Sequence, residues 1–151
     1  MSERTTISKS GRAEAPIAVV WSLLADARNY STWALPRSTT LEREGSPTPD
    51  GVGAIRRFGS WPFFSREEVV EFEPPHRLSY VLRSGLPVRD YRADVELREA
   101  VASTGGVATA VSWTSSFDVR HQWMRTPMRL LLSVILKDFV KRLAKEAAKR
   151  V

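Results

Sequence analysis

The stretch EEVVEFEPPHRLSYVLRSG, residues 67–85, indicates two β-strands that fold back on each other. Apolar and polar side chains alternate on both sides of a proline pair, and proline, which has no backbone N–H, is excluded from the inside of a central strand. We therefore predict strands at Glu67–Phe72 and Leu78–Arg83, joined by a turn at EPPH. Tyr80 and Leu82 share the face of the second strand that turns away from water, which raises the question of what they face.

Alternating and β-branched segments predict further strands around this pair. The clearest is YRADVELREA, residues 91–100, in which apolar and charged side chains alternate. Another, GVGAIRRFG, is bounded by glycines on both sides. The further strands that we expect are residues 5–15, 38–45, 51–59, 91–100 and 107–119. The sheet then has about six or seven antiparallel strands.

Two kinds of helix are predicted. Pro16 suits the first turn of a short helix, PIAVVWSLLAD, and ARNYSTWA adds a second short helical turn that ends before Pro36. A long helix starts at Pro127, because apolar residues then recur at steps of three and four. Its expected inward stripe consists of Met128, Leu131, Leu132, Ile135, Phe139, Leu143 and Ala147.

The order of these elements predicts an α+β fold, in which one curved antiparallel sheet packs against the long C-terminal helix. A twisted sheet of this many strands curls, and a single helix about 10–12 Å across cannot fill its whole concave face. We therefore expect a space between the helix and the sheet.

Composition places the chain among ordinary globular proteins. The 151 residues fit one domain, residues 1–151, and 42% hydrophobic with 26% charged residues is typical of folded chains. The first 15 residues are polar, and the longest apolar run, LLLSVIL, is too short for a bilayer, so we expect a cytoplasmic protein with no membrane span. The absence of cysteine excludes disulfides and thiol nucleophiles.

The net charge of +6 is concentrated near the C-terminus. Residues 137–151 hold six basic and two acidic side chains. A cationic helix end complements the helix dipole, so we expect this segment to be a solvated helix face. No nucleic-acid partner is expected, because no zinc finger, helix-turn-helix or RNA-binding motif accompanies the charge. The oligomeric state is left open.

Two patterns carry a resemblance to a known family. They are P-x-x-x-V-W-x-L-L-A-D-x-x-x-Y-x-x-W from Pro16 to Trp33, and V-x-E-x-x-P-P-x-R-L-x-Y from Val69 to Tyr80. Together with the order of elements, they make nearly the whole chain similar to the polyketide cyclase/dehydrase and lipid-transport superfamily, also called START-like or SRPBCC proteins. The resemblance implies a helix-grip fold, in which the sheet wraps around the long helix and encloses a deep apolar cavity. It also implies that Tyr80 and Leu82 face this cavity.

Apolar and aromatic residues on the inner faces are the candidate ligand-binding residues. Small-molecule pockets combine such walls with a few placed polar groups, although aromatic residues also fill core volume in any domain. The expected cavity lining is Trp61, Tyr80, Leu82, Tyr91, Val95, Val111, Trp113, Phe117, Met128, Leu132 and Ile135. The aromatic segment Gly59–Ser65 is either a lid or part of the core.

The sequence contains no established catalytic motif. His76 and His121 have no partners at metal-ligand spacing, and glycine-rich phosphate loops and hydrolase motifs are absent, so we expect neither a metal nor a cofactor. Alternation in residues 51–59 allows either Arg56 or Arg57 to point inward, and a buried guanidinium needs a carboxylate or an anionic ligand. If the protein is an enzyme, its candidate catalytic residues are Tyr80, Tyr91 and Arg57.

Three functions follow as hypotheses. The first is binding of a hydrophobic or aromatic small molecule, such as a lipid, a polyketide or an isoprenoid, in the cavity. The second is an enzyme of the polyketide aromatase/cyclase type, which needs a proton donor or acceptor held near a carbonyl. The third is a protein-interaction module that uses the basic C-terminal helix, and this function predicts salt-sensitive association.

Overall fold

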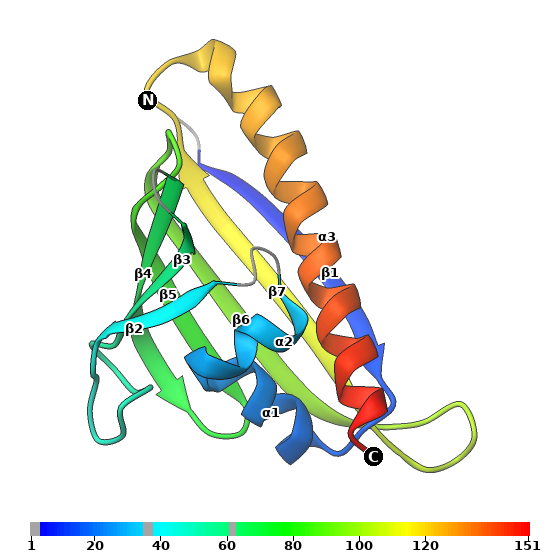
Figure 1. Ribbon diagram of the computed structural model, residues 1–151. Coiled ribbons are helices and arrows are strands. Elements are labelled where there is room, and N and C mark those ends of the chain that lie inside the picture. The colour runs from blue at the N-terminus through cyan, green and yellow to red at the C-terminus, as the bar shows by residue number, and fades with distance from the viewer. Residues whose placement is uncertain (1–3, 35–37, 61–62) are drawn as a thin grey trace.

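A computed structural model describes residues 4–34, 38–60 and 63–151. Its centre is one seven-stranded antiparallel sheet with the strand order β1-β7-β6-β5-β4-β3-β2 (Figure 1). The strands are β1 (Thr5–Ala13), β2 (Thr39–Arg43), β3 (Ile55–Ser60), β4 (Phe63–Glu73), β5 (Arg77–Ser84), β6 (Arg89–Val101) and β7 (Val107–Asp118). The two strands predicted around the proline pair are β4 and β5, so this expectation is confirmed.

A long helix lies across the concave side of the sheet, and the short helices that follow the first strand cover another part of that side (Figure 1). The helices are α1 (Ile17–Ala25), η1 (Ala27–Asn29), α2 (Tyr30–Trp33), η2 (Gln122–Met124) and α3 (Arg125–Lys149). The predicted α+β fold, with short helices after the first strand and a long C-terminal helix, is therefore confirmed. Within the described residues, no helix combines the length and the apolar character needed to cross a bilayer.

The short helices are fastened to one another by specific hydrogen bonds. Asp26 ends α1 and accepts a hydrogen bond from the backbone N–H of Arg28 at 2.9 Å, which starts η1. The Trp33 indole N–H donates to the carbonyl oxygen of Leu23 at 2.9 Å, in the protein interior. This buried bond joins α2 to α1 and fixes the position of α2 beside the sheet.

Strands β6 and β7 supply the inner face of the sheet with the predicted alternation. Tyr91, Val95, Val111 and Phe117 are buried, and the polar and charged residues that alternate with them point to the other side. Val107, the first residue of β7, is by contrast 62% exposed. It pairs with Val101 at the hairpin end of the two strands, where no helix covers the sheet.

The inward stripe of α3 differs from the predicted one at several positions. The buried residues are Met128, Leu132, Leu136, Val140, Leu143 and Ala147, whereas Ile135 and Phe139 are partly buried beside them. Leu131, expected inside, is exposed. The first half of α3 has apolar residues on two sides, so a spacing of three and four residues was compatible with two stripes.

Helix α3 approaches β1 closely at Gly11. A Cβ atom at this position would lie 2.7 Å from Cγ1 of Val140, a distance that packed atoms do not adopt. The absence of a side chain at Gly11 therefore lets the helix sit directly on the strand.

The outer face of the sheet carries a network of half-buried charges. Arg77 lies 2.8 Å from Glu71 and from Glu96, and 3.2 Å from Asp94, while Arg92 contacts Asp94 at 3.2 Å. These side chains are neighbours on adjacent strands, where opposite charges attract one another across the sheet. The network keeps the outer face polar, so the apolar core lies only on the helix side.

Candidate functional site

A buried ion pair lies between the sheet and the helices. Arg56 of β3 is completely buried, and its Nη2 atom lies 3.2 Å from Oε1 of Glu67 on β4. The two residues are direct cross-strand partners in the β3–β4 register. The Glu67 side chain is 13% exposed. The pairing supplies the carboxylate that a buried guanidinium requires.

Aromatic rings surround the Arg56 guanidinium. Its Nη1 atom donates to the Tyr30 hydroxyl at 3.2 Å and to the carbonyl oxygen of Leu24 at 3.4 Å. The guanidinium carbon lies 4.8 Å from the ring centroid of Tyr30, 5.5 Å from that of Tyr80 and 5.7 Å from that of Phe58. Such contacts favour the charged form. The Nε atom of Arg56 has no hydrogen-bond acceptor in the part of the chain that the structure describes.

The structure resolves the choice between Arg56 and Arg57 that the alternation left open. Arg56 points into the interior, whereas the Arg57 guanidinium stacks on Phe64, 4.7 Å from its ring centroid. Arg57, which we named as the candidate catalytic residue, lies outside the interior cluster. Neighbouring residues of a strand point to opposite faces, so only one of the two arginines can occupy the core.

Burial changes the proton affinity of the groups in this cluster. It raises the pKa of Glu67 to about 7, against the attraction of the Arg56 guanidinium. Burial likewise raises the pKa of Tyr30 to about 12 and that of Tyr80 well above its ordinary value. At neutral pH the phenols therefore keep their protons, and Glu67 exchanges its proton readily. A carboxyl group with this property can act as an acid or as a base.

The cluster borders a small interior cavity of about 60 Å³. This volume has room for a few water molecules and is much smaller than the deep cavity that we expected. The reason is that aromatic side chains of the sheet and of α3 fill most of the space. The residues that line the cavity are Tyr30, Phe58, Ser65, Glu67, Tyr80, Trp113 and Phe139.

Of the predicted lining residues, Tyr80 and Trp113 border the cavity. The Trp113 indole N–H donates to the Tyr80 hydroxyl at 3.2 Å, and both side chains are buried. Tyr91 lies next to them, with its ring centroid 6.4 Å from that of Tyr80. Its hydroxyl is 2.7 Å from the Ser115 hydroxyl, and burial raises the pKa of Tyr91 to about 12. The two tyrosines named as catalytic candidates are therefore neighbours in the interior.

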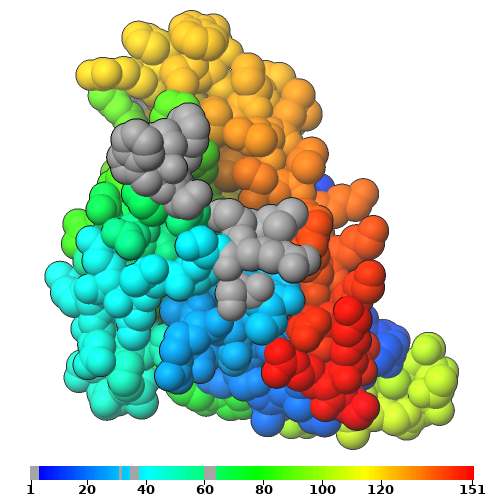
Figure 2. Space-filling model, viewed as in Figure 1, coloured from blue at the N-terminus to red at the C-terminus, as the bar shows by residue number. Residues whose placement is uncertain are grey.

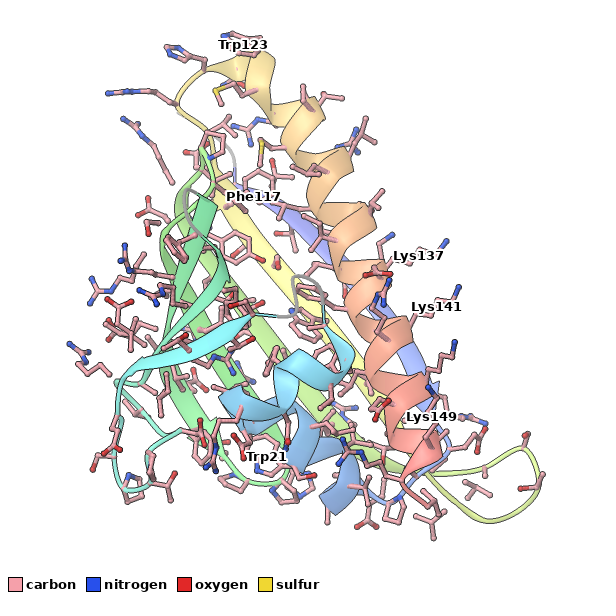
Figure 3. The ribbon with its side chains drawn as sticks, in the orientation of Figure 1. Trp21, Phe117, Trp123, Lys137, Lys141 and Lys149 are labelled. Carbon is pink, nitrogen blue, oxygen red and sulfur yellow. The ribbon has the colours of Figure 1, made fainter. Side chains whose placement is uncertain are left out.

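The other predicted lining residues belong to the surrounding core. Val95, Val111, Phe117, Met128 and Leu132 are buried in it, and Figure 3 shows Phe117 at the end of β7 that lies nearer the start of α3. Leu82 and Ile135 are partly buried at its edge. Trp61 lies outside the described residues, as does part of the segment Gly59–Ser65. The two alternatives for this segment, a lid or part of the core, therefore stay predictions.

Sequence reasoning did not include five of the residues that line the cavity: Tyr30, Phe58, Ser65, Glu67 and Phe139. One signal could have identified Glu67. Pairing β3 with β4 as a hairpin places a carboxylate directly opposite Arg56, and a buried arginine needs such a partner. Phe139 belonged to the predicted helix stripe but was assigned to the core. Tyr30 could not be placed, because its position depends on how α2 folds over the sheet.

The described residues contain no group of three or more side chains that could hold a metal ion. His76 contacts the carbonyl oxygen of Leu97 through Nδ1 at 3.2 Å, in a strand connection. His121 stacks on Trp123, with ring centroids 6.3 Å apart, and is not among the residues that line the cavity. Neither histidine contributes to the candidate site.

Comparison with solved structures identifies proteins of the same fold. They include the protein XoxI from Bacillus cereus (17% identity, 94% of each chain covered, TM-score 0.75) and a START superfamily protein from Mycobacterium smegmatis (12% identity, 97% of this chain and 99% of that chain, TM-score 0.76). A norcoclaurine synthase point mutant from Thalictrum flavum, in complex with a transition-state analogue, is also similar (16% identity, 99% and 98% covered, TM-score 0.70). At these identities the likeness shows the fold alone.

No curated protein sequence gives a significant match. A family model described as polyketide cyclase/dehydrase and lipid transport matches residues 4–148, which is nearly the whole chain. This match agrees with the curved sheet that grips the C-terminal helix and with the two sequence patterns described above. The chain therefore belongs to the polyketide cyclase/dehydrase and lipid-transport family of START-like proteins.

Proposed function

We propose that this protein binds a hydrophobic or aromatic small molecule, such as a lipid, a polyketide or an isoprenoid, between the sheet and α3. The observation that carries the proposal is the Arg56 cluster. A completely buried guanidinium, with a free Nε–H among the described residues, lies beside a cavity with aromatic walls. This combination matches the usual construction of a small-molecule pocket, in which an apolar wall surrounds a few polar groups.

Stability alone does not account for a buried ion pair. Removing two charges from water costs several kcal/mol per ion, and well-packed apolar residues of similar volume are often as stable or more stable. The Arg56–Glu67 pair is therefore better explained by a ligand that it recognises. A carbonyl or carboxylate group of the ligand would accept a hydrogen bond from Arg56, while the rest of the molecule contacts Phe58, Trp113 and Phe139.

The size of the cavity requires that binding be accompanied by expansion. A volume of about 60 Å³ is too small for any molecule of the proposed class. Phe139 is the only lining residue on α3, and it is partly buried rather than fully enclosed. Displacement of Phe139 and of the adjoining part of α3 would enlarge the cavity without breaking the sheet.

Native mass spectrometry of freshly purified protein tests the proposal. We expect a stoichiometric hydrophobic adduct that is released on denaturation and identifies the ligand class. Arg56→Met should reduce the bound fraction by about tenfold, since a hydrogen bond to a charged group contributes about 1.5–3 kcal/mol. Arg57→Met, next to it on the opposite face, is the matched control. Equal losses in the two variants, both of them folded, would contradict the proposed role of Arg56.

A second candidate function is an enzyme of the aromatase/cyclase type. The pKa of about 7 at Glu67 favours it, because a group that titrates near the working pH is an effective acid or base. One of the proteins with the same fold is named as a norcoclaurine synthase, which supports an enzyme as the alternative. Glu67 would remove a proton next to a ligand carbonyl, and Arg56 or Tyr80 would stabilise the oxygen that becomes negative.

Kinetics separate the enzyme from the carrier. With a poly-β-ketone substrate, Glu67→Gln should lower kcat by about 100-fold or more and leave KM nearly unchanged, which is the usual contribution of an acid or base. Tyr80→Phe and Tyr91→Phe test the two phenols in the same way. Turnover that is absent in the wild-type protein, or that survives all three substitutions, would exclude this mechanism.

A further inference from the structure

The first half of α3 and the turn before it expose an unusual number of apolar side chains. The exposed fractions are 74% for Trp123, 58% for Leu130, 46% for Leu131 and 68% for Val134. The three aliphatic residues lie on the side of α3 opposite its buried stripe, because their spacing follows the helical repeat. We call this surface the α3 tip. Figure 3 shows Trp123 at the extreme end of the molecule.

The α3 tip projects from the molecule instead of lying in a flat face. In Figure 1, η2 and the first turns of α3 extend past the end of the sheet, and in Figure 2 the same segment forms a protruding end. A projecting group of apolar side chains is suited to insertion into a soft layer. A rigid protein partner would instead need a matching hollow.

Basic residues border the apolar side chains. Arg120, Arg129, Lys137 and Lys141 are exposed, and none of them forms an ion pair with a described residue. Asp138 is the one acidic residue between positions 119 and 141, and it is paired with Arg142 at 2.8 Å. Figure 3 shows that Lys137 and Lys141 point away from the sheet. The tip therefore presents positive charge that is not neutralised locally.

The rest of the basic cluster predicted at the C-terminus differs from the tip, because several of its side chains form ion pairs. Arg142 pairs with Asp138, and Lys149 and Arg150 both contact Glu146, at 4.0 and 3.3 Å. These pairs lie within α3 and reduce the charge at its end, where Glu146 is shared by two basic residues. The excess positive charge is thus nearer the α3 tip than the sequence indicated.

A groove of about 460 Å³ lies beside the tip. Its walls contain both basic and apolar side chains, from the β5–β6 connection with the start of β6 and from the segment that precedes α3. The residues are Pro87, Val88, Arg89, Arg120, His121 and Met124. Such a lining suits a molecule with an anionic group next to a hydrocarbon part.

We propose that the α3 tip docks on a lipid bilayer that contains anionic lipids. Trp123 would occupy the interface between headgroups and acyl chains, where amphipathic aromatic rings are favoured. Leu130, Leu131 and Val134 would enter the outer part of the acyl layer, and the four basic residues would contact the headgroups. The groove would accept one phosphate group with the glycerol part of its lipid.

Charge argues against a second copy of the chain as the occupant. In an antiparallel contact between two α3 helices, centred on Leu130 and Leu131, Lys137 of one chain would face the turn with Arg120 and His121 of the other. Like charges would then meet at both ends of the contact. An anionic bilayer, in contrast, attracts every basic residue of the tip.

Flotation with lipid vesicles tests the proposal. The intact protein should float with vesicles of phosphatidylcholine and phosphatidylglycerol and should remain behind with pure phosphatidylcholine vesicles, and added salt should release it. Lys137→Gln and Arg129→Gln should each weaken binding about fivefold, the usual effect of one basic residue near an anionic surface. The double variant Leu130→Gln with Val134→Gln should lose binding almost completely.

Matched controls come from the opposite end of the molecule. Lys149→Gln removes a charge from the other end of α3, and Val101→Gln with Val107→Gln changes two equally exposed valines of the β6–β7 hairpin. Both controls should float like the wild type. Failure of the wild-type protein to float, or equal losses in tip and control variants, would overturn the proposal. A dimer in light scattering that the double tip variant dissociates would assign the surface to a second copy and overturn it as well.

Discussion

The two faces of the sheet carry charge clusters that are similar in chemistry and opposite in environment. On the outer face, Arg77 lies within 3.2 Å of three carboxylates, and water reaches all of these side chains. On the inner face, Arg56 lies 3.2 Å from one carboxylate and is completely buried. The outer arginine has more partners, yet the inner one is far more dependent on its single partner.

The difference shows that the surroundings of an ion pair decide its importance. Water screens the outer charges, so the loss of one partner is largely compensated by solvent. In the interior little solvent is available, so the loss of one partner leaves the other poorly compensated. We therefore expect the inner pair to control stability and pH dependence, and the outer network to have small effects.

Removal of the inner arginine should have the largest effect. Arg56→Ala leaves Glu67 without its counter-ion and Tyr30 without its donor, so we expect the free energy of unfolding to fall by about 3–5 kcal/mol. Urea denaturation measures this change. The double variant Arg56→Met with Glu67→Leu should recover most of the loss, since it removes both charges. A double variant as unstable as Arg56→Ala would show that the pair does not act through charge.

The pH dependence of stability should be the second largest effect. The pKa of Glu67 is about 7 in the folded protein and near its ordinary value of 4.5 when the chain unfolds. The folded state therefore binds the proton more tightly, so this contribution to stability is complete below pH 4.5 and is lost as the pH rises through 7. The total change is about 3 kcal/mol.

The comparison that isolates this effect is wild type against Glu67→Gln, by thermal unfolding between pH 4.5 and 8. Their difference in stability should shift steadily in favour of Glu67→Gln as the pH rises. Glu71→Gln, on the outer face, should follow the wild-type curve. A constant difference between wild type and Glu67→Gln would refute the raised pKa.

Breaking a buried hydrogen bond between two neutral groups should have an intermediate effect on the free energy of unfolding. Tyr91→Phe leaves the Ser115 hydroxyl without the partner that lies 2.7 Å away, and an unsatisfied buried hydroxyl costs about 1–3 kcal/mol. Adding Ser115→Ala removes the unsatisfied group, and the double variant should regain part of this stability. If the double variant loses as much stability as the two single variants together, the two hydroxyls do not interact.

The outer network should give the smallest effect. Arg77→Ala should lower the free energy of unfolding by about 1 kcal/mol or less, because its three carboxylate partners remain hydrated. The effect should decrease further in high salt, which screens exposed charges. Denaturation at low and high salt measures both quantities. A loss as large as that of Arg56→Ala would remove the distinction between the two faces.

The fold was predictable because its signals are local. Alternation identified β4 to β7, glycines and prolines marked their ends, and the apolar repeat after Pro127 identified α3. The errors arose where the partner surface decides burial. Leu131 satisfies the helical repeat as well as Leu132 does, and only the position of the sheet determines that one is buried and the other exposed.

The site was less predictable because it depends on pairings between distant segments. Tyr80 and Trp113, which the alternation placed on the apolar faces of their strands, are buried and hydrogen-bonded to each other. Whether Arg56 or Arg57 is buried depends on the β3–β4 register, and the sequence does not reveal this register until both strands are paired. Tyr30 and Phe139 reach the site from helices, whose orientation over the sheet is a property of the whole fold.

The missing side chain at Gly11 has a consequence for how this protein can diversify. Val140 packs against Gly11, and the adjacent residue of α3, Phe139, lines the cavity. A larger residue at position 11 would lift the helix and draw Phe139 outward with it. If this protein binds a ligand as proposed, a change in this one strand would therefore enlarge the space for it, while every residue of the cavity wall remains the same. Selection for ligand size would then act on a position that a comparison of binding-site residues overlooks.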